Sequence, residues 1–427
     1  MANQHRVLII GGGFAGLYAA KSLRKLPVEI TLIDQRNFHL FQPLLYQVAT
    51  GAISPGEIAS PLRGILRRNK NTRVLMSKVI QVDSAAKKVQ VEEGWVEYDT
   101  LIIATGVTHS YFGHDEWSTI AHGLKTVEDA LEIRRDIYMA FERAEATTND
   151  AERKALLTFA IIGGGPTGVE MAGALAELSR RTLRGNFRSI DPSSARILLL
   201  EADDRILPTY DPFLSAKATR SLEKLGVEVR TGSRVTSVAE GSVLITRGIE
   251  QERIPTRCAI WAAGVRASSF GSSLRDSLGA ATDRVGRIVV GPDLSLPFDP
   301  SVFVIGDLAA FYDSAGAQLP GVAQVAMQQG RYVASVLRAR LPGSSVGAFR
   351  FRDPGSIAVI GRNAAVFSRG RIKLWGWPAW FVWAFIHLAY LIEFDNKLLV
   401  LLQWAWSYLT FNRGARLIGA AEGERDY

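Results

Sequence analysis

The pattern of apolar positions divides the chain into a long α/β part and a short aromatic tail. The first apolar run, Val7 to Ile10, has no polar interruption. Short continuous runs of this kind, bounded by glycine, are typical of buried strands in parallel sheets. A glycine-rich turn and a helix-forming run follow, and VEITLID then predicts a second strand that ends at Asp34. The order strand, helix, strand predicts a βαβ unit.

This order of elements recurs farther along the chain. LLTFAII predicts a strand, a second glycine-rich turn opens a predicted helix, and RILLLE predicts a strand that ends at Glu201. Each copy also has a later apolar strand that ends in glycine, LIIATG at Gly106 and AIWAAG at Gly264. Two copies of one supersecondary plan predict two dinucleotide-binding sites in one protein.

The spacing within each turn explains the prediction of a nucleotide. In Gly11-x-Gly13-x-x-Gly16 the first glycine permits a tight turn, the second lets a pyrophosphate approach the backbone, and the third lets helix and strand pack closely. The acid that ends the next strand can accept hydrogen bonds from a ribose. A glycine-rich turn in an unrelated α/β protein is the competing interpretation. The second copy repeats the spacing at Gly163, Gly165 and Gly168.

A third signal follows the buried strand VFVI. Gly306-Asp307 comes directly after it, and an aspartate there can bind a hydroxyl-rich chain such as the ribityl group of a flavin. An aspartate after a strand is also a common helix cap, so this alternative stays open. The two fingerprints before it favour the flavin interpretation.

The aromatic tail, Leu374 to Phe411, has a different pattern. It contains six of the nine tryptophans, and its two apolar runs, 379–392 and 398–411, are separated by the charged sequence EFDNK. A single membrane-spanning helix needs roughly 20 apolar residues, whereas shorter runs suit helices that lie in the membrane interface. Basic residues flank both ends of the block: Arg369, Arg371 and Lys373 before it, Arg413 and Arg416 after it.

We therefore expect two short helices that contact a lipid bilayer through residues 371–416. Tryptophan favours the interface, and Lys and Arg favour anionic head groups. A dimer interface and a transmembrane hairpin are the alternatives. A homodimer is left open.

Composition narrows the function classes. The chain has 427 residues, 47% hydrophobic and 22% charged, which are globular values with room for two or three domains. The lone cysteine, Cys258, excludes an internal disulfide and a thiol redox pair. The six histidines are scattered, so no metal site is expected. The net charge of +8 is dispersed and no recognition motif accompanies it, so nucleic-acid binding is not expected.

Together these motifs resemble the two-dinucleotide-binding flavoproteins of the glutathione-reductase type, over about Arg6 to Leu341. The lone cysteine excludes the branch with a CxxC disulfide. The chain is similar to one other branch, the type II NADH dehydrogenases, which are non-pumping NADH:quinone oxidoreductases. The motif AQVAMQQG carries this resemblance, with FHLFQPLLYQVATG (38–51), GGGPTGVEMAGALAE (163–177) and the aromatic tail. One departure is Asp34, where many relatives have glutamate.

The resemblance implies FAD at the first fingerprint and NADH at the second. The implied flavin-site residues are Gly11, Gly13, Phe14, Ala15, Gly16, Asp34, Gln35, Gln42, Gln47, Val79, Ala104, Thr105, Gly106, Gly306, Asp307, Ala323, Gln324 and Ala326. The implied NADH-site residues are Gly163, Gly165, Pro166, Thr167, Gly168, Glu170, Glu201, Ala263 and Gly264.

Three residues are implied to act in the reaction. Glu170 would position substrates and serve the proton path, although a glutamate in a first helical turn also suits the helix dipole. Gln324 and Gln328, spaced i and i+4, would donate to the carbonyl oxygens of a quinone. An exposed helix face is the alternative for this pair. Glu201 would select NADH by repelling the 2′-phosphate of NADPH, or it is an exposed acid at a strand end.

The sequence thus predicts an α/β fold with two Rossmann-like domains and C-terminal amphipathic membrane-anchoring helices. We expect an FAD domain over 1–155 and 271–354, an NADH domain over 156–270 and a membrane region over 355–427. NADH would pass hydride to the flavin N5, and a membrane quinone would receive two electrons at the cytoplasmic face of the inner membrane. A soluble reductase of a small electron-carrier protein and a redox-sensing flavoprotein remain the alternatives.

Overall fold

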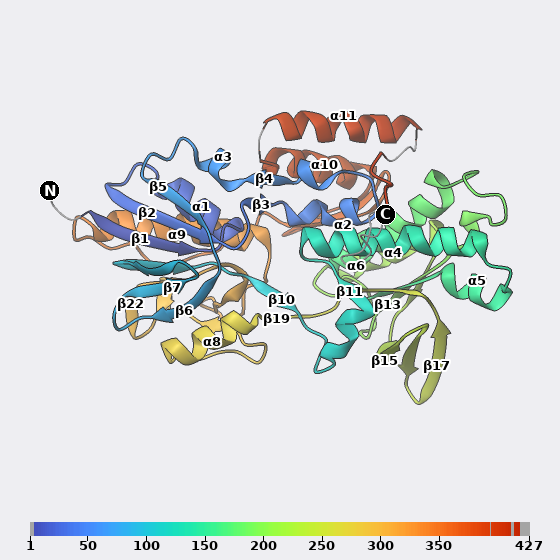
Figure 1. Cartoon of the computed structure of the whole chain (residues 1–427), viewed down its shortest axis with the longest axis horizontal. Coiled ribbons are helices and arrows are strands. Elements are labelled where there is room, and N and C mark those ends of the chain that lie inside the picture. The colour runs from blue at the N-terminus through green and yellow to red at the C-terminus, as the bar shows by residue number, and fades with distance from the viewer. Residues whose placement is uncertain (1–3, 393, 411–413, 419–427) are drawn as a thin grey trace. The chain divides into compact units, whose positions relative to one another are not determined.

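The computed structural model describes residues 4–392, 394–410 and 414–418 (Figure 1). Contacts divide the chain into two compact units, each built from separate segments. The first unit comprises Met1–Leu40, Ala59–Thr108 and Val265–Pro354, and the second comprises Phe41–Ile58, His109–Gly264 and Gly355–Tyr427. The predicted boundaries of the FAD and NADH domains differ from these. The predicted domains are defined by the nucleotide that each segment binds, which these contacts do not test, so their boundaries stay predictions.

The first unit is built on a six-stranded sheet in the order β21-β22-β9-β1-β2-β5. The strands from β22 to β5 are parallel, as the uninterrupted apolar runs predict, and β21 is antiparallel to β22. The strands are β1 (His5–Ile10), β2 (Val28–Asp34), β5 (Thr72–Met76), β9 (Thr100–Ile103), β21 (Ser295–Leu296) and β22 (Asp299–Val304). A smaller antiparallel sheet joins β6 (Val79–Asp83), β7 (Lys88–Val91) and β8 (Gly94–Glu97).

Two long helices of this unit pack unusually closely. They are α1 (Phe14–Leu23), which follows the first glycine turn, and α9 (Ala323–Arg340). A methyl group at Gly330 would lie 2.3 Å from the carbonyl oxygen of Ala15, so only glycine allows this approach. The unit also contains α3 (Leu62–Leu66), α8 (Ser269–Leu278) and the short turn η6 (Gly306–Leu308).

The second unit repeats the plan with a five-stranded parallel sheet in the order β11-β18-β12-β13-β14. Its strands are β11 (Ala121–Gly123), β12 (Thr158–Ile162), β13 (Arg196–Leu200), β14 (Val227–Arg230) and β18 (Cys258–Trp261). Its helices include α4 (Val127–Ala146), α5 (Asp150–Leu156), α6 (Pro166–Glu177) and α7 (Pro212–Lys224). An antiparallel sheet joins β15 (Arg234–Ala239), β16 (Ser242–Arg247) and β17 (Glu250–Pro255). The expectation of an α/β fold with two dinucleotide-binding sheets is confirmed.

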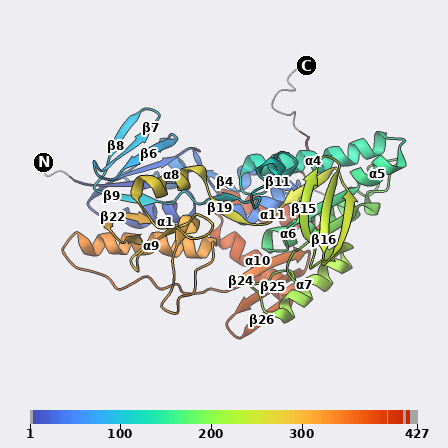
Figure 2. The ribbon, with the colours of Figure 1, turned by 90° about the horizontal axis from the view of Figure 1, so that it is seen from below.

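The C-terminal region begins with a sheet and ends with two helices. The antiparallel sheet comprises β24 (Ser356–Gly361), β25 (Ala364–Arg369) and β26 (Ile372–Gly376), and it lies beside α7 in Figure 2. The helices are α10 (Trp377–Tyr390) and α11 (Phe394–Thr410), which lie side by side in Figure 1. The sequence predicted the helices but not the sheet. Predicted residues Arg413 and Phe411 lie outside the described ones.

A single glycine fixes this sheet to the nucleotide-binding part of the unit. A methyl group at Gly173, in α6, would lie 1.6 Å from the carbonyl oxygen of Ile360, in β24. Helix and strand therefore meet backbone to backbone. The sheet that contains β24 is thus packed against α6 within the second unit.

We expect Gly173→Ala to lower the free energy of unfolding by about 2 kcal/mol or more, because neither backbone can make room for the methyl group. Urea unfolding measures the change. Gly347→Ala is the control, because no atom lies within 4 Å of a methyl group there, and it should change stability by less than about 0.5 kcal/mol. Equal effects of the two substitutions would contradict the proposed packing.

Candidate nucleotide-binding and catalytic site

The first glycine turn is shaped by backbone contacts that exclude other residues. Gly11 has φ +102°, its N–H donates to the carbonyl oxygen of Ile33 (2.8 Å), and a methyl group there would lie 2.4 Å from the oxygen of Ala104. A methyl group at Gly16 would lie 1.9 Å from the oxygen of Gly11. Gly13, in contrast, has nothing within 4 Å of that position. The open side of the turn therefore lies at the N-terminus of α1, where an anion is favoured.

The acid at the end of β2 holds this turn. Asp34 accepts hydrogen bonds from the N–H groups of Gly12 (2.6 Å) and Arg36 (2.7 Å). Burial raises the pKa of the Asp34 carboxyl group, and the two hydrogen bonds oppose this shift. Each carboxylate oxygen has a second lone pair, so the group can still accept from a ribose hydroxyl.

The second turn reproduces this geometry in the other unit. The N–H of Gly163 donates to the oxygen of Leu200 (2.8 Å), and a methyl group at Gly168 would again lie 1.9 Å from the first glycine's oxygen. Glu201 accepts from the N–H of Gly164 (2.5 Å), as Asp34 does from Gly12. Gly165 is as open as Gly13. The internal repeat is therefore present in the hydrogen bonds of the two turns as well as in the sequence.

The residues present fit a dinucleotide in the first unit. Thr105, after β9, has a buried hydroxyl oxygen with no hydrogen-bond partner among the described residues, and such a group needs a partner. The next residue, Gly106, has φ +69° and nothing within 4 Å of a methyl position. An open glycine pair and an unsatisfied hydroxyl group at the carboxyl ends of parallel strands are the features of a nucleotide site.

The predicted flavin-site residues after residue 300 come together in the same unit. The N–H of Gly306 donates to the side-chain oxygen of Gln329 (2.6 Å), and the carboxyl group of Asp307 lies beside Gly321, just before α9. Gln329 is buried in α9 and was missed by the sequence analysis. The only signal for it was its place inside the AQVAMQQG motif.

His39 is a second missed residue. Its Nδ1 donates to the carbonyl oxygen of Gly12 (2.9 Å), and its ring packs edge-on against Phe14, with ring centroids 4.9 Å apart. Burial lowers the pKa of His39 to about 4, so the ring is neutral at physiological pH. A histidine in an apolar run gives no sequence signal for this contact with the glycine turn.

The two glutamines of α9 differ in their surroundings. The Gln328 carboxamide donates to the backbone oxygen of Arg352 (2.9 Å) and accepts from its N–H (3.0 Å). Gln324 is half-buried in the first turn of the helix, and no described residue pairs with its carboxamide. Gln328 therefore ties the chain near residue 352 to α9, whereas the Gln324 carboxamide has no hydrogen-bond partner among the described residues.

Glu170 lies in α6, one turn beyond the open end of the helix. Burial raises the pKa of its carboxyl group to about 8, which a long hydrogen bond from the N–H of Val359 (3.4 Å) opposes. The group is thus mostly protonated at neutral pH. A carboxylic acid that holds its proton at neutral pH can act as a proton donor.

Two predicted flavin-site residues, Gln42 and Gln47, lie in the second unit. Gln47, in α2 (Leu45–Ala49), donates to the hydroxyl oxygen of Tyr46 (2.9 Å) and accepts from the indole Nε1 of Trp404 (2.9 Å). Gln42 donates to the backbone oxygen of Lys125 (2.8 Å). Both amides are therefore engaged within the second unit.

The remaining predicted residues divide between the two units. Ala15 (α1), Gln35 (after β2), Val79 (β6), Ala104 (after β9), Ala323 and Ala326 (α9) lie in the first unit. Pro166 and Thr167 (α6), Ala263 and Gly264 (after β18) lie in the second. Lys373, noted at the edge of the tail, pairs with Asp211 (2.5 Å).

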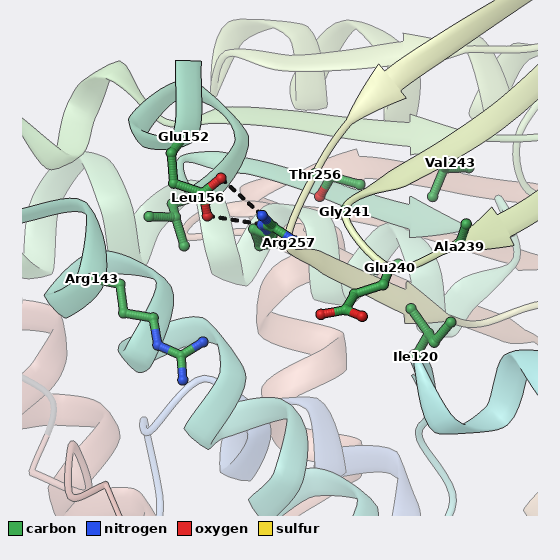
Figure 3. A pocket seen from close by; sticks show the side chains of 11 residues that line it. Ile120, Arg143, Glu152, Leu156, Ala239, Glu240, Gly241, Val243, Thr256 and Arg257 are labelled. Atoms are coloured by element: carbon green, nitrogen blue, oxygen red, sulfur yellow. Dashed lines mark hydrogen bonds and ion pairs between the residues drawn. The ribbon is translucent and has the colours of Figure 1, made fainter. Parts of the chain in front are cut away.

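The second unit also contains a pocket of about 360 Å³ that none of the predicted residues lines. Arg143, Glu152, Glu240 and Arg257 line it together with apolar side chains such as Leu156 and Ile120 (Figure 3). Glu152 binds the Arg257 guanidinium through two hydrogen bonds of 2.9 Å. The charges balance one another, so we assign this pocket no part in nucleotide binding.

Comparisons with known proteins agree with this geometry. Residues 5–330 match the pyridine nucleotide-disulphide oxidoreductase family. The chain is 45% identical to the type II NADH:quinone oxidoreductase Ndh of Mycobacterium tuberculosis, over 96% of this chain and 89% of that protein. It is 29% identical to the type II NADH:quinone oxidoreductase of Staphylococcus haemolyticus, over 85% and 89%.

The solved structure of NDH2 from Plasmodium falciparum in complex with NADH has the same fold, with a TM-score of 0.86, 19% identity and coverage of 96% of this chain and 99% of that one. The fold, the paired glycine turns and the full-length similarity point the same way. The chain belongs to the pyridine nucleotide-disulphide oxidoreductase family and, within it, to the type II NADH:quinone oxidoreductases.

Proposed function

We propose that this protein is a membrane-associated NADH:quinone oxidoreductase that uses FAD and does not pump protons. The observation that carries this function is the duplicated turn, in which two acids, Asp34 and Glu201, hold two open glycine sites in the same way. One site suits FAD and the other NADH. When bound, FAD supplies the two-electron chemistry that links NADH to the quinone.

The first unit holds FAD. The open N-terminus of α1 at Gly13 receives the pyrophosphate, and Asp34 receives the ribose of the adenosine half. The unsatisfied hydroxyl group of Thr105 and the backbone at Gly106 lie at the carboxyl end of β9, on the other side of β1 from β2. Asp307 takes the ribityl hydroxyl groups.

The second unit holds NADH. The pyrophosphate binds at the N-terminus of α6, beside Gly165, and Glu201 accepts from the adenosine ribose. The same carboxylate would lie against the 2′-phosphate of NADPH and repel it. NADH is therefore the preferred donor.

We expect Glu201→Gln to lower the preference for NADH over NADPH by about 10- to 100-fold, which corresponds to the loss of one hydrogen bond to a charged group. The measurement is kcat/KM for both donors with a fixed quinone. Glu240→Gln, on the rim of the pocket away from the turn, should leave the preference unchanged. A preference that survives Glu201→Gln would remove this residue from donor selection.

Glu170 supplies a proton during quinone reduction. Its pKa of about 8 means that the carboxyl group is neutral at pH 7 and ionises only in mildly alkaline solution. The β24 backbone lies against it at Val359. Proton donation by a positioned acid typically contributes 10²–10⁴-fold.

We expect quinone reduction to fall as the pH rises through about 8, because the protonated form of Glu170 is lost. Glu170→Gln should lower the rate about 100-fold at pH 7 and remove this inflection. Stability gives an independent readout. Because the folded pKa exceeds the ordinary 4.5, the wild type loses stability between pH 4.5 and 8, and the Gln variant should not. An unchanged inflection in the variant would assign the titration to another group.

Gln324 binds the quinone head group. Its carboxamide can donate to a quinone oxygen without bringing a charge into an apolar site. Gln328 supports this arrangement indirectly, because its pairing with the backbone of Arg352 fixes the chain there to α9.

The outer face of α10 and α11 contacts the lipid bilayer. Phe385, Leu402 and Trp406 are 74%, 57% and 62% exposed, whereas Trp383 and Val400 on the other face are buried. None of the helices among the described residues combines the length and apolar content needed to cross a membrane. The exposed apolar face and the flanking Arg369, Arg371 and Arg416 suit an interfacial position on the anionic cytoplasmic leaflet.

We expect replacement of Phe385, Leu402 and Trp406 by glutamine to abolish sedimentation with anionic vesicles and reduction of a lipophilic quinone, while oxidation of NADH with a water-soluble acceptor persists. These substitutions are preferable to truncation from residue 371, which would remove β26. The matched control replaces Met76, Ile249 and Phe298, which are exposed to 58%, 100% and 58% elsewhere on the chain.

The control variant should bind vesicles like the wild type. Retained vesicle binding by the first variant, together with loss of a dimer, would assign the face to contact between two copies of the chain. Loss of every activity in both variants would indicate general destabilisation.

A further inference from the structure

Phe112 presents an exposed aromatic ring from a tight turn. Five non-glycine residues among the described ones have positive φ: Lys87, Phe112, Leu207, Leu294 and Asn363. Lys87 and Asn363 lie in hairpin turns, and Leu207 and Leu294 are fully buried, so turn geometry and packing account for them. Phe112 has φ +53° because it lies with Gly113 (φ +98°) in a tight turn that the N–H of His114 closes on the carbonyl oxygen of Tyr111 (3.1 Å). The turn explains this backbone conformation, but it does not explain why a large apolar ring is 68% exposed.

The neighbours of Phe112 hold it in this conformation. The N–H of Ser110 donates to the oxygen of Gly264 (3.3 Å), and Trp261 Nε1 donates to the oxygen of Ser110 (2.9 Å). Tyr111 is buried, and its hydroxyl group donates to the oxygen of Ala121 (2.8 Å). The residues just before Phe112 are thus fixed to the end of β18, and the ring of Phe112 faces solvent.

The ring lies directly over Gly264. A methyl group at Gly264 would lie 2.6 Å from Cζ of Phe112, and the ring centroid is 6.2 Å from that of Trp261. Gly264 itself has φ +71° and occupies, in the second repeat, the place of Gly106 in the first. The exposed ring face therefore stands at the carboxyl end of β18.

Sheet topology decides which part of NADH reaches this point. In the order β11-β18-β12-β13-β14, strands β13 and β18 flank β12 on opposite sides. Glu201 ends β13 and takes the adenosine ribose, and the N-terminus of α6 after β12 takes the pyrophosphate. A dinucleotide that crosses the switch point continues over β18 with its other half.

We infer that Phe112 contacts the nicotinamide half of NADH, with its ring against the nicotinamide or its ribose. This inference rests on the proposed NADH site and adds a positioning residue to it. An aromatic wall on Gly264 restricts the orientation of the planar nicotinamide ring, and contact with this ligand would account for the exposure of the Phe112 ring.

Calorimetric titration of the FAD-loaded full-length protein with NAD⁺ and with ADP-ribose tests the inference, because ADP-ribose lacks the nicotinamide. Phe112→Asn removes the ring, and asparagine tolerates positive φ, so the loop should stay folded. We expect Kd for NAD⁺ to rise about tenfold and Kd for ADP-ribose to change less than twofold. Phe112→Tyr keeps the ring and should bind both ligands like the wild type.

Phe298→Asn is the matched control, since it removes another exposed ring (58%) from the first unit, and it should change neither affinity. Unchanged NAD⁺ affinity in Phe112→Asn would overturn the inference, and so would an equal loss for both ligands. Failure of the wild type to bind either ligand would instead overturn the proposed NADH site, which distinguishes the two failures.

Discussion

The approach of each fingerprint helix to its own turn constrains the rest of the structure. At Gly16 and Gly168 a single methyl group would lie 1.9 Å from a backbone oxygen, so helix and turn can meet only at glycine. This contact aims the N-termini of α1 and α6 at the carboxyl ends of the parallel strands. The free N–H groups and the positive dipole end then face the space beside Gly13 and Gly165. The backbone alone therefore favours an anion at both places.

The acids at the ends of β2 and β13 complete this constraint. Asp34 and Glu201 each accept a hydrogen bond from the N–H of a glycine within a turn, so the group proposed to bind a ribose also fixes the turn proposed to receive the pyrophosphate. On this proposal one side chain couples two parts of ligand recognition. The shorter acid in the first copy makes the same hydrogen bond as the longer acid in the second. Aspartate at position 34, where many relatives have glutamate, therefore preserves this contact.

The sequence predicted those parts of the molecule that local pattern controls. The two glycine turns, the apolar strands, the strand-end acids and the paired apolar helices of the tail each depend on residues close together in the chain. The sheet β24–β26 was missed, although Asn363 and Gly370, both with positive φ, mark its two turns as hairpins. The sequence analysis assigned these residues to the membrane region because the apolar tail follows them directly.

Long-range partners could not be predicted from local pattern. The spacing of Gln324 and Gln328 places both on one helix face, but nothing in it indicates that Arg352 takes the amide of Gln328. The same holds for Gln47, whose partner Trp404 lies more than 350 residues away. Amides are common partners for backbone and indole groups, so a motif that contains several of them shows where ligands can bind without showing which amide remains available.

The position of β24 links the C-terminal region to the chemistry. Glu170 has a raised pKa because water is removed from it, and the backbone of β24 at Val359 and Ile360 is what lies against that side of α6. The hydrogen bond from Val359 is too long, at 3.4 Å, to offset the loss of hydration. At the other end of the same region, α11 holds α2 through Trp404 and Gln47. The C-terminal region therefore contains both the exposed apolar face, on α10 and α11, and the strand β24, which lies against Glu170. Removing the whole region would change both features at once.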